Sequence, residues 1–361
     1  MISPEKVTLL DIAKIAVGRN ASDIHITAGA APAIRIDGKI TYLADEFPTL
    51  YPKDTQRIIY SIMNERQKRM FEEKNEIDFS IGIKEIGRFR VNVFRQRGTV
   101  AAALRRIPYE IKSMEELGLI PSVESLCKKS MGLVLVTGPT GSGKTTTLAS
   151  MIDYINKNYP YHIITIEDPI EYLFPHKKSI VAQREIGADT EDFATALKYA
   201  LREDPDVILV GEMRDLETIK AALTAAETGH LVFATLHTNT AIQTINRIIN
   251  VFPESEQDQI RTELSFVLQG VISQRLLPKI GGGRVLIHEV LIPTTAIRNL
   301  IRENKIHQIY GLMQTGQAET GMQTMNQSLM EAIRKGLILP EDALKASPDP
   351  QELTRMLKTR V

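Results

Sequence analysis

The sequence GLVLVTGPTGSGKTTT, residues 132–147, decides how the second half of the chain can fold. The apolar run 133–136 has the length of a buried parallel strand, and the residues from Lys144 onward have the composition of a helix start. Between them, Gly138, Gly143, Lys144 and Thr145 match the pattern G-x-x-x-x-G-K-[ST]. The stretch therefore predicts a strand, a glycine-rich loop and a helix N-terminus in direct succession.

A loop of this kind holds anions. Its backbone N–H groups converge on phosphates, and the helix dipole favours their negative charge. The lysine of the motif reaches the β- and γ-phosphates, and the hydroxyl that follows it holds Mg²⁺. We expect a nucleoside triphosphate here, bound by Gly138, Pro139, Thr140, Gly141, Ser142, Gly143, Lys144, Thr145 and Thr146.

Composition limits the class of protein. The chain has 361 residues, enough for two or three domains, and 44 basic residues balance 44 acidic ones. A neutral chain gives no support to nucleic-acid binding, and a single cysteine, Cys127, excludes an internal disulfide. No apolar run approaches the roughly 20 residues that cross a bilayer, and residues 1–20 lack the order of a signal peptide. We expect a cytoplasmic protein that reaches a membrane only through a partner.

The order of predicted strands and helices in residues 1–107 is typical of an α+β domain. Strand-like runs at 24–27, 33–36, 39–43, 77–83, 87–96 and 99–106 follow one another without alternating helices, and 55–74 is expected to be one long charged helix. Asp37-Gly38 predicts a two-residue hairpin turn. In 87–96 the residues Arg88 and Arg90 share one face of the strand. A solvated sheet surface and a functional role are equally compatible with them.

Residues 108–121 are expected to be a linker, and 122–292 a second domain in which strands and helices alternate. Apolar runs at 133–136, 163–166, 207–210 and 231–234 predict a parallel sheet covered on both faces. Loops at the carboxyl ends of such strands build the site. A hairpin is expected around residues 281–283, and 293–361 is expected to be a helical C-terminal region.

Two acidic segments follow predicted strands. The strand 206–210 is followed by Gly211 and Glu212, and Glu212 is a candidate Mg²⁺ ligand opposite Thr145 although the usual strand-end aspartate is replaced by glycine. The segment IEDPIE, 166–171, carries three carboxylates, one of which could activate water. Capping of a helix or pairing with arginines is the alternative for each of these acids.

Two histidines, His230 and His237, stand at opposite ends of the strand in TGHLVFATLHT. Histidines at strand ends are often structural, and their spacing fits no zinc site. Together these four segments, in this order, resemble the secretion-type hexameric ATPases of type II and type IV secretion and type IV pili, where they are called the Walker A, Asp, Walker B and His boxes. Ser22-Asp23-Ile24-His25 resembles the N-terminal domain of that family, and residues 296–303, AIRNLIRE, are similar to the C-terminal signature of the motors that retract pili.

The resemblance implies an α/β protein with a PAS-like N-terminal domain and a RecA-like ATPase domain, assembled as a homo-hexamer with ATP and Mg²⁺. It implies that Glu171 is the catalytic glutamate, that Glu212 is the Walker B acid and that His230 reads the nucleotide state. Arginines of the N-terminal domain would approach the γ-phosphate; the candidates are Arg88, Arg90 and Arg105.

The function implied is a motor that retracts type IV pili and powers twitching motility through an inner-membrane pilus platform protein. Two alternatives stay open from the residues themselves. One is a RecA-fold nucleic-acid translocase, and the other is a weakly hydrolysing ATP-binding regulator of a secretion machine. The helix expected at 296–303 would couple nucleotide-driven motion to pulling, with Arg298 and Arg302 on an exposed face.

Overall fold

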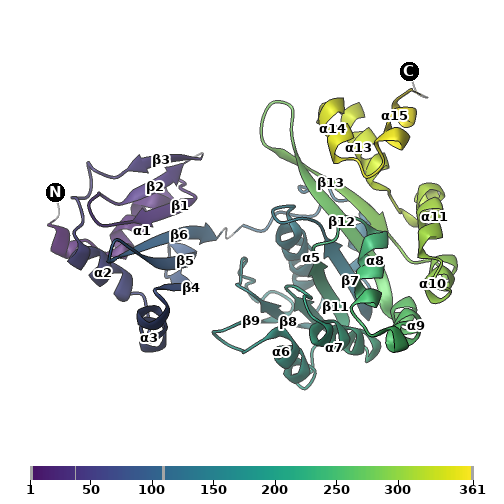
Figure 1. Cartoon of the computed structure of the whole chain (residues 1–361), viewed down its shortest axis with the longest axis horizontal. Helices are drawn as coiled ribbons and strands as arrows, with labels where there is room; N and C mark the ends of the chain where they lie inside the picture. Colours follow the sequence, from purple (N-terminus) through teal and green to yellow (C-terminus); the bar gives the residue numbers. More distant parts are fainter. Residues whose placement is uncertain (1–2, 37, 108–109, 359–361) are drawn as a thin grey trace. The chain divides into compact units, whose positions relative to one another are not determined.

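The computed structural model describes residues 3–36, 38–107 and 110–358. The chain divides into two compact units, the first built from residues 1–110 together with 171–173 and the second from 111–170 and 174–361 (Figure 1). Residues 171–173 are not part of the second unit. No helix among the described residues is both long enough and apolar enough to span a membrane.

The first unit is an antiparallel sheet in the strand order β3-β2-β1-β6-β5-β4. The side chains of Phe89, Val91 and Val93 on one face of β5 are buried, as the alternation along this strand predicts. This confirms an α+β unit. Its strands are β1 (Asp23–Ile26), β2 (Ala33–Ile36), β3 (Lys39–Tyr42), β4 (Glu76–Ile83), β5 (Gly87–Gln96) and β6 (Thr99–Ile107).

The helices of the first unit correct one expectation. Residues 55–74 do not form a single helix; α2 (Pro52–Tyr60) ends and α3 (Glu65–Lys74) begins after Asn64. The side chain of Asn64 accepts a hydrogen bond from the backbone N–H of Gln67 at 2.8 Å. Asparagine is among the strongest helix N-caps, so it starts a new helix within this charged stretch. The remaining helix of the unit, α1 (Leu9–Gly18), begins at its N-cap Thr8.

On either side of the hairpin turn expected at residues 37 and 38, Ile36 of β2 is paired with Lys39 of β3. Asp37 itself, like Pro108 and Tyr109 of the expected linker, lies outside the described residues.

The second unit contains a mixed, mostly parallel sheet in the order β13-β12-β7-β11-β10-β8-β9. Only the β12–β13 pairing is antiparallel. The four predicted strands are confirmed as neighbours, with β7 between β11 and β12. This arrangement is typical of a RecA-like domain and confirms the expected fold class. The strands are β7 (Gly132–Thr137), β8 (His162–Glu167), β9 (Ile180–Glu185), β10 (Val207–Val210), β11 (Leu231–Leu236), β12 (Leu268–Pro278) and β13 (Arg284–Leu291).

Helices cover the sheet and fill the C-terminal region, as expected. In Figure 1, α13, α14 and α15 gather near the turn of the β12–β13 hairpin, whereas α10 lies beside α9. The helices are α4 (Pro121–Leu126), α5 (Lys144–Asn158), α6 (Phe193–Ala200), α7 (Leu216–Glu227), α8 (Ala241–Asn250), α9 (Gln257–Val267), α10 (Thr295–Arg302), α11 (Ile309–Thr315), α12 (Gln317–Thr320), α13 (Met325–Arg334), α14 (Pro340–Ala346) and α15 (Pro350–Lys358).

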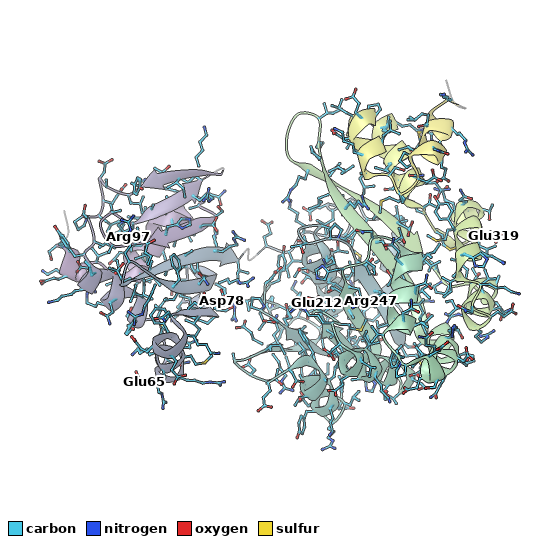
Figure 2. All side chains as sticks on the ribbon, viewed as in Figure 1. Glu65, Asp78, Arg97, Glu212, Arg247 and Glu319 are labelled. Carbon is cyan, nitrogen blue, oxygen red and sulfur yellow. The ribbon has the colours of Figure 1, made fainter. Side chains whose placement is uncertain are left out.

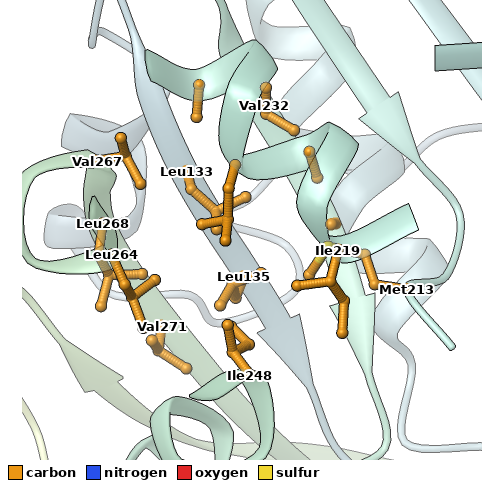
Figure 3. Close-up of a cluster of buried hydrophobic side chains, with 14 of the residues drawn as sticks. Leu133, Leu135, Met213, Ile219, Val232, Ile248, Leu264, Val267, Leu268 and Val271 are labelled. Carbon is orange, nitrogen blue, oxygen red and sulfur yellow. The ribbon is translucent and has the colours of Figure 1, made fainter. Parts of the chain in front are cut away.

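The apolar core of the second unit holds β7 in place. Leu133 and Leu135 of β7 are fully buried in one apolar cluster with Ile219 of α7, Ile248 of α8 and Leu264 of α9 (Figure 3). Complete burial of side chains of this size contributes about 1.5–3 kcal/mol each. The strand that precedes the glycine-rich loop is therefore held rigidly, and the loop starts from a fixed point.

Helix α10 corrects a second expectation. Arg298 is half-buried, and its guanidinium donates to the backbone carbonyls of Ser265 at 2.5 Å and Phe266 at 3.0 Å. Arg302 is exposed, but it donates to the Ser265 hydroxyl at 3.2 Å and lies over the Phe266 ring. The two arginines therefore bind the C-terminal end of α9 and do not project from a bare helix face. The last carbonyls of a helix lack partners within it, which explains the contact.

Candidate active site

The glycine-rich loop runs from the end of β7 to the start of α5, as predicted. Gly138 has a φ of +146°, and a Cβ added there would lie 2.3 Å from the backbone oxygen of Gln274 and 2.6 Å from the hydroxyl of Ser142. Gly143 has a φ of +89° and immediately precedes α5. Both positions require glycine, the first because space is lacking and the second because of its backbone conformation.

Lys144 opens α5 and folds back over the loop. Its Nζ donates to the carbonyl of Gly138 at 2.8 Å and to that of Pro139 at 3.2 Å. The side chain is half-buried, as are those of Thr145 and Thr146 in the same turn. The ammonium group thus lies beside the phosphate-binding loop and adds to the positive end of the helix dipole.

Glu212, labelled in Figure 2, follows the carboxyl end of β10 by two residues, and the charge of Lys144 acts on it. One carboxylate oxygen lies 2.7 Å from Nη2 of Arg214, and the other lies 3.0 Å from Nε2 of His237. Burial acts to raise the pKa of Glu212, but the hydrogen bond from Arg214 and the charges of Arg214, His237 and Lys144 lower it below the ordinary value. Glu212 is therefore ionised at neutral pH, and it is bonded by two side chains from different segments, Arg214 and His237.

The glycine in the usual place of an aspartate has a steric reason. The N–H of Gly211 donates to the carbonyl of Ile166 on β8 at 2.8 Å. A Cβ at Gly211 would lie 3.1 Å from that oxygen and 3.3 Å from the Cα of Glu167. The close approach of the two backbones leaves little room for a side chain, and the acid follows one residue later.

The donor set suits a magnesium ion bound together with phosphates. Mg²⁺ takes oxygen ligands, usually one or two from the protein with phosphate oxygens and water completing the shell. Thr145 supplies a hydroxyl and Glu212 an ionised carboxylate. No group of three or more histidine, cysteine or acidic side chains that could hold a metal without phosphate occurs in the described residues.

The three acids at the end of β8 and in the loop after it have different surroundings. Glu167 is buried and accepts hydrogen bonds from the Thr165 hydroxyl at 2.6 Å and from Gln183 at 3.2 Å. Asp168 is exposed. The hydrogen bond that Arg214 donates to Glu212 is the main cause that raises the pKa of Arg214, and the charge of Asp168 adds to it. Glu171 is exposed in the loop beyond. Burial and bonding indicate a structural role for Glu167 and leave Glu171 available to solvent.

The two histidines are separated by the full length of β11. His237 follows the carboxyl end of the strand and contacts Glu212. His230 precedes the strand, where its Nδ1 lies 2.9 Å from the carbonyl of Ala225 near the end of α7. The six residues of β11 lie between them, which corresponds to a separation of roughly 20 Å. The structure thus brings His237, and not His230, to the loop within this unit.

The candidate arginines of the first unit lie on neighbouring strands of its sheet. Arg90 on β5 is paired directly with Arg105 on β6. Nε of Arg105 lies 2.9 Å from Asp23, although 76% of its side chain is exposed. Directly opposed like charges destabilise a sheet, and the Asp23 carboxylate on β1 offsets this by pairing with Arg105. Arg88 is half-buried on the same face of β5.

Two residues of the site were missed from the sequence. Arg214 pairs with Glu212, and Gln274 on β12 donates to the carbonyl of Ser142 in the glycine-rich loop at 2.9 Å. A glutamine inside an apolar strand, as in VISQRLL, is a signal that the sequence offered for Gln274. Arg214 gave no such signal, because a charged residue in a loop is ordinary.

Comparison with known proteins agrees with this geometry. Residues 4–345 match the family described as Type II/IV secretion system protein. The chain is 52% identical over 333 residues to the type IV pilus retraction ATPase PilT of Pseudomonas aeruginosa, covering 92% of this chain and 96% of the relative. It is 49% identical over 340 residues to a twitching motility protein of Neisseria gonorrhoeae, covering 92% and 90%.

Among solved structures, the chain is similar to the crystal structure of the pilus retraction motor PilT with bound ADP. The TM-score is 0.92 at 64% identity, and the match covers 97% of this chain and 100% of the other. The family match extends over nearly the whole chain. The chain therefore belongs to the type II/IV secretion system ATPase family.

Proposed function

We propose that this chain is the ATP-hydrolysing motor of type IV pilus retraction and thereby drives twitching motility. The observation that carries the proposal is the convergence of Lys144, Glu212 and His237 at one edge of the sheet. The extensive similarity to retraction ATPases supports pilus retraction, rather than pilus assembly, as the process that the motor drives. We also propose that the segment AIRNLIRE, which contains the exposed Arg302, couples ATP hydrolysis to the pulling of the pilus.

In the proposed reaction, water attacks the γ-phosphorus of ATP and the bond to the bridging oxygen of ADP breaks. The loop N–H groups and Lys144 bind the phosphates, and Thr145 and Glu212 are the residues that would hold Mg²⁺. When bound, Mg²⁺ neutralises charge on the phosphate oxygens. Glu171 accepts the proton of the attacking water, a role that its exposure permits.

The proposal includes a cytoplasmic homo-hexamer that acts on an inner-membrane platform protein. Arg88, Arg90 and Arg105 would stabilise the transferring phosphoryl group after assembly, when the first unit of one chain meets the nucleotide of another. The neighbouring side chains of Arg90 and Arg105 are both largely exposed, which supports an anionic partner for this face. His230 would sense the nucleotide in the same way, across chains, since it lies apart from the loop of its own unit.

The test combines turnover with motility. Lys144→Ala should abolish ATP hydrolysis, because contacts between a lysine and phosphate contribute several kcal/mol to stabilising the transition state. Twitching should be lost as well in cells that lack the native motor, and the melting temperature should stay unchanged. The matched control is Lys128→Ala, because Lys128 is an exposed lysine that pairs with Glu124 on the surface. Turnover of Lys144→Ala within tenfold of wild type would contradict the assignment of the loop.

Two results would favour another function, and a third would contradict the proposed role of the arginines. DNA-dependent turnover would support the translocase, and negligible turnover in assembled rings would support the regulator. Specific activity that does not fall on dilution would contradict arginines supplied by a second chain, since such arginines contribute about 10³–10⁵ in kcat.

A further inference from the structure

Strand β12 supports the phosphate-binding loop from the side. It runs parallel to β7, with Ser273 beside Thr137, and the hydroxyls of these two residues lie 2.8 Å apart. The next residue, Gln274, is 1% exposed. The mechanism above gives this buried amide no role.

The amide of Gln274 makes one contact that bears on phosphate binding. Its Nε2 donates to the backbone oxygen of Ser142 at 2.9 Å. In a trans peptide the C=O of one residue and the N–H of the next point in opposite directions. By holding the oxygen of Ser142 toward β12, Gln274 therefore turns the N–H of Gly143 away from β12. That N–H belongs to the loop that cradles the phosphates.

The two glycines that shape the loop also face this residue. A Cβ at Gly138 would meet the backbone oxygen of Gln274 at 2.3 Å, and a Cβ at Gly143 would meet its Nε2 at 3.4 Å. The Oε1 atom of Gln274 has no hydrogen-bond partner within the part of the chain that the structure describes. The amide is therefore held in this buried position by packing and by one donated hydrogen bond.

We propose that Gln274 is a positioning residue for nucleotide binding, which fixes the Ser142–Gly143 peptide so that the Gly143 N–H is presented to a phosphate. The inference rests on the proposed function, since it assumes that the loop binds a nucleotide. It assigns part of the affinity for phosphate to a side chain on a neighbouring strand that does not touch the ligand.

A matched pair of variants tests the proposal. Gln274→Met keeps the length of the side chain and removes the donor. Gln323→Met is the control, because Gln323 is also buried and its Nε2 donates to the backbone oxygen of His288 at the same 2.9 Å, on β13. The measurements are the dissociation constant for ADP with Mg²⁺, by calorimetry, and the melting temperature of each variant.

We expect Gln274→Met to weaken ADP binding by about 10- to 100-fold, the range for one hydrogen bond to a charged group. Gln323→Met should bind ADP like the wild type even where its melting temperature falls as far. Equal affinities for wild type and Gln274→Met, or equal losses in both variants, would overturn the proposal. A wild-type chain that fails to bind ADP would overturn the proposed function itself, and the inference with it.

A second variant gives a readout that a purely structural role would not move. Gln274→Glu keeps the shape of the side chain, but an ionised carboxylate only accepts and cannot donate to Ser142. Burial raises the pKa of a carboxyl group, and the protonated form has an O–H donor. The ADP affinity of Gln274→Glu, relative to wild type, should therefore recover as the pH is lowered toward 5. A ratio that stays constant with pH would contradict the role of the donor.

Discussion

Nε2 of His237 lies 3.0 Å from a carboxylate oxygen of Glu212, and this contact joins the ends of β11 and β10 beside the phosphate-binding loop. The other oxygen of Glu212 is paired with Arg214. A carboxylate with both oxygens bonded is fixed in orientation. His237 therefore acts on the site through Glu212, the proposed Mg²⁺ ligand.

We expect His237→Ala to lower turnover by about 10- to 100-fold, the usual effect of removing a group that orients a metal ligand. The melting temperature should change little, because 47% of the His237 side chain is exposed. The comparison is His230→Ala, at the far end of the same strand, measured in assembled rings. If His230→Ala loses more activity than His237→Ala, then sensing across chains outweighs the contact with Glu212.

We expect Glu171, the proposed general base, and Glu167, the last residue of β8, to respond differently to substitution. Glu171→Gln should slow hydrolysis by about 10²–10⁴-fold, the contribution of a general base, while ADP binding and the melting temperature stay unchanged. Glu167→Gln should instead lower the melting temperature, because Glu167 is buried and accepts bonds from Thr165 and Gln183. Abolished turnover in Glu167→Gln with an unchanged melting temperature would reverse these two assignments.

Buried His288 predicts a pH dependence of stability. Burial lowers the pKa of His288 to about 4, and neither ring nitrogen has a hydrogen-bond partner among the described residues. Between about pH 4 and the unfolded value near 6.5, the unfolded chain binds a proton that the folded chain does not, so the free energy of unfolding falls as the pH falls. The slope is about 1.4 kcal/mol per pH unit, or roughly 3 kcal/mol over the window.

Unfolding in urea at pH 7.5 and pH 5 measures this effect. The variant His288→Leu should lose most of the difference between the two values, whereas His307→Leu, at a position exposed in the structure, should keep it. An unchanged pH dependence in His288→Leu would assign the effect to other groups.

The sequence predicted those parts of the fold that have a strong local signal. The apolar run before Gly138 could only be a buried strand, and residues 207–210 form β10 with the predicted bounds. By contrast, β9 has half-exposed side chains and gave no apolar run. The split between α2 and α3 depended on the single cap Asn64 within a charged stretch that otherwise favours one helix.

The sequence predicts the residues that bind the nucleotide better than the residues that position other side chains or the loop. Lys144 and Glu212 follow from the motif spacing and from the order of parallel strands. The choice between His230 and His237 depends on which end of β11 meets the loop, and parallel strands place their carboxyl ends together. Gln274 could not be assigned to the loop, since its strand is adjacent to β7 only after the chain has folded.

The segment AIRNLIRE can be tested through Arg302 and not through Arg298. Arg298 donates to two carbonyls at the end of α9, so Arg298→Ala should lower the free energy of unfolding by about 1.5–3 kcal/mol. A loss of function in that variant could then not be separated from a loss of stability. Arg302 is exposed, and its contact with the Phe266 ring contributes about 0.5–1 kcal/mol. Arg302→Ala should therefore fold, form rings and hydrolyse ATP at the wild-type rate.

If this helix couples hydrolysis to pulling, the same Arg302→Ala variant should fail to support twitching in cells. The control is Arg334→Ala, because Arg334 is an arginine in the last turn of α13 whose ion pair with Glu331 is long, at 4.0 Å. Twitching and turnover are compared in both variants at equal protein levels. Normal twitching in Arg302→Ala would remove Arg302 from the coupling. Joint loss of turnover, twitching and melting temperature would show that the helix only supports α9.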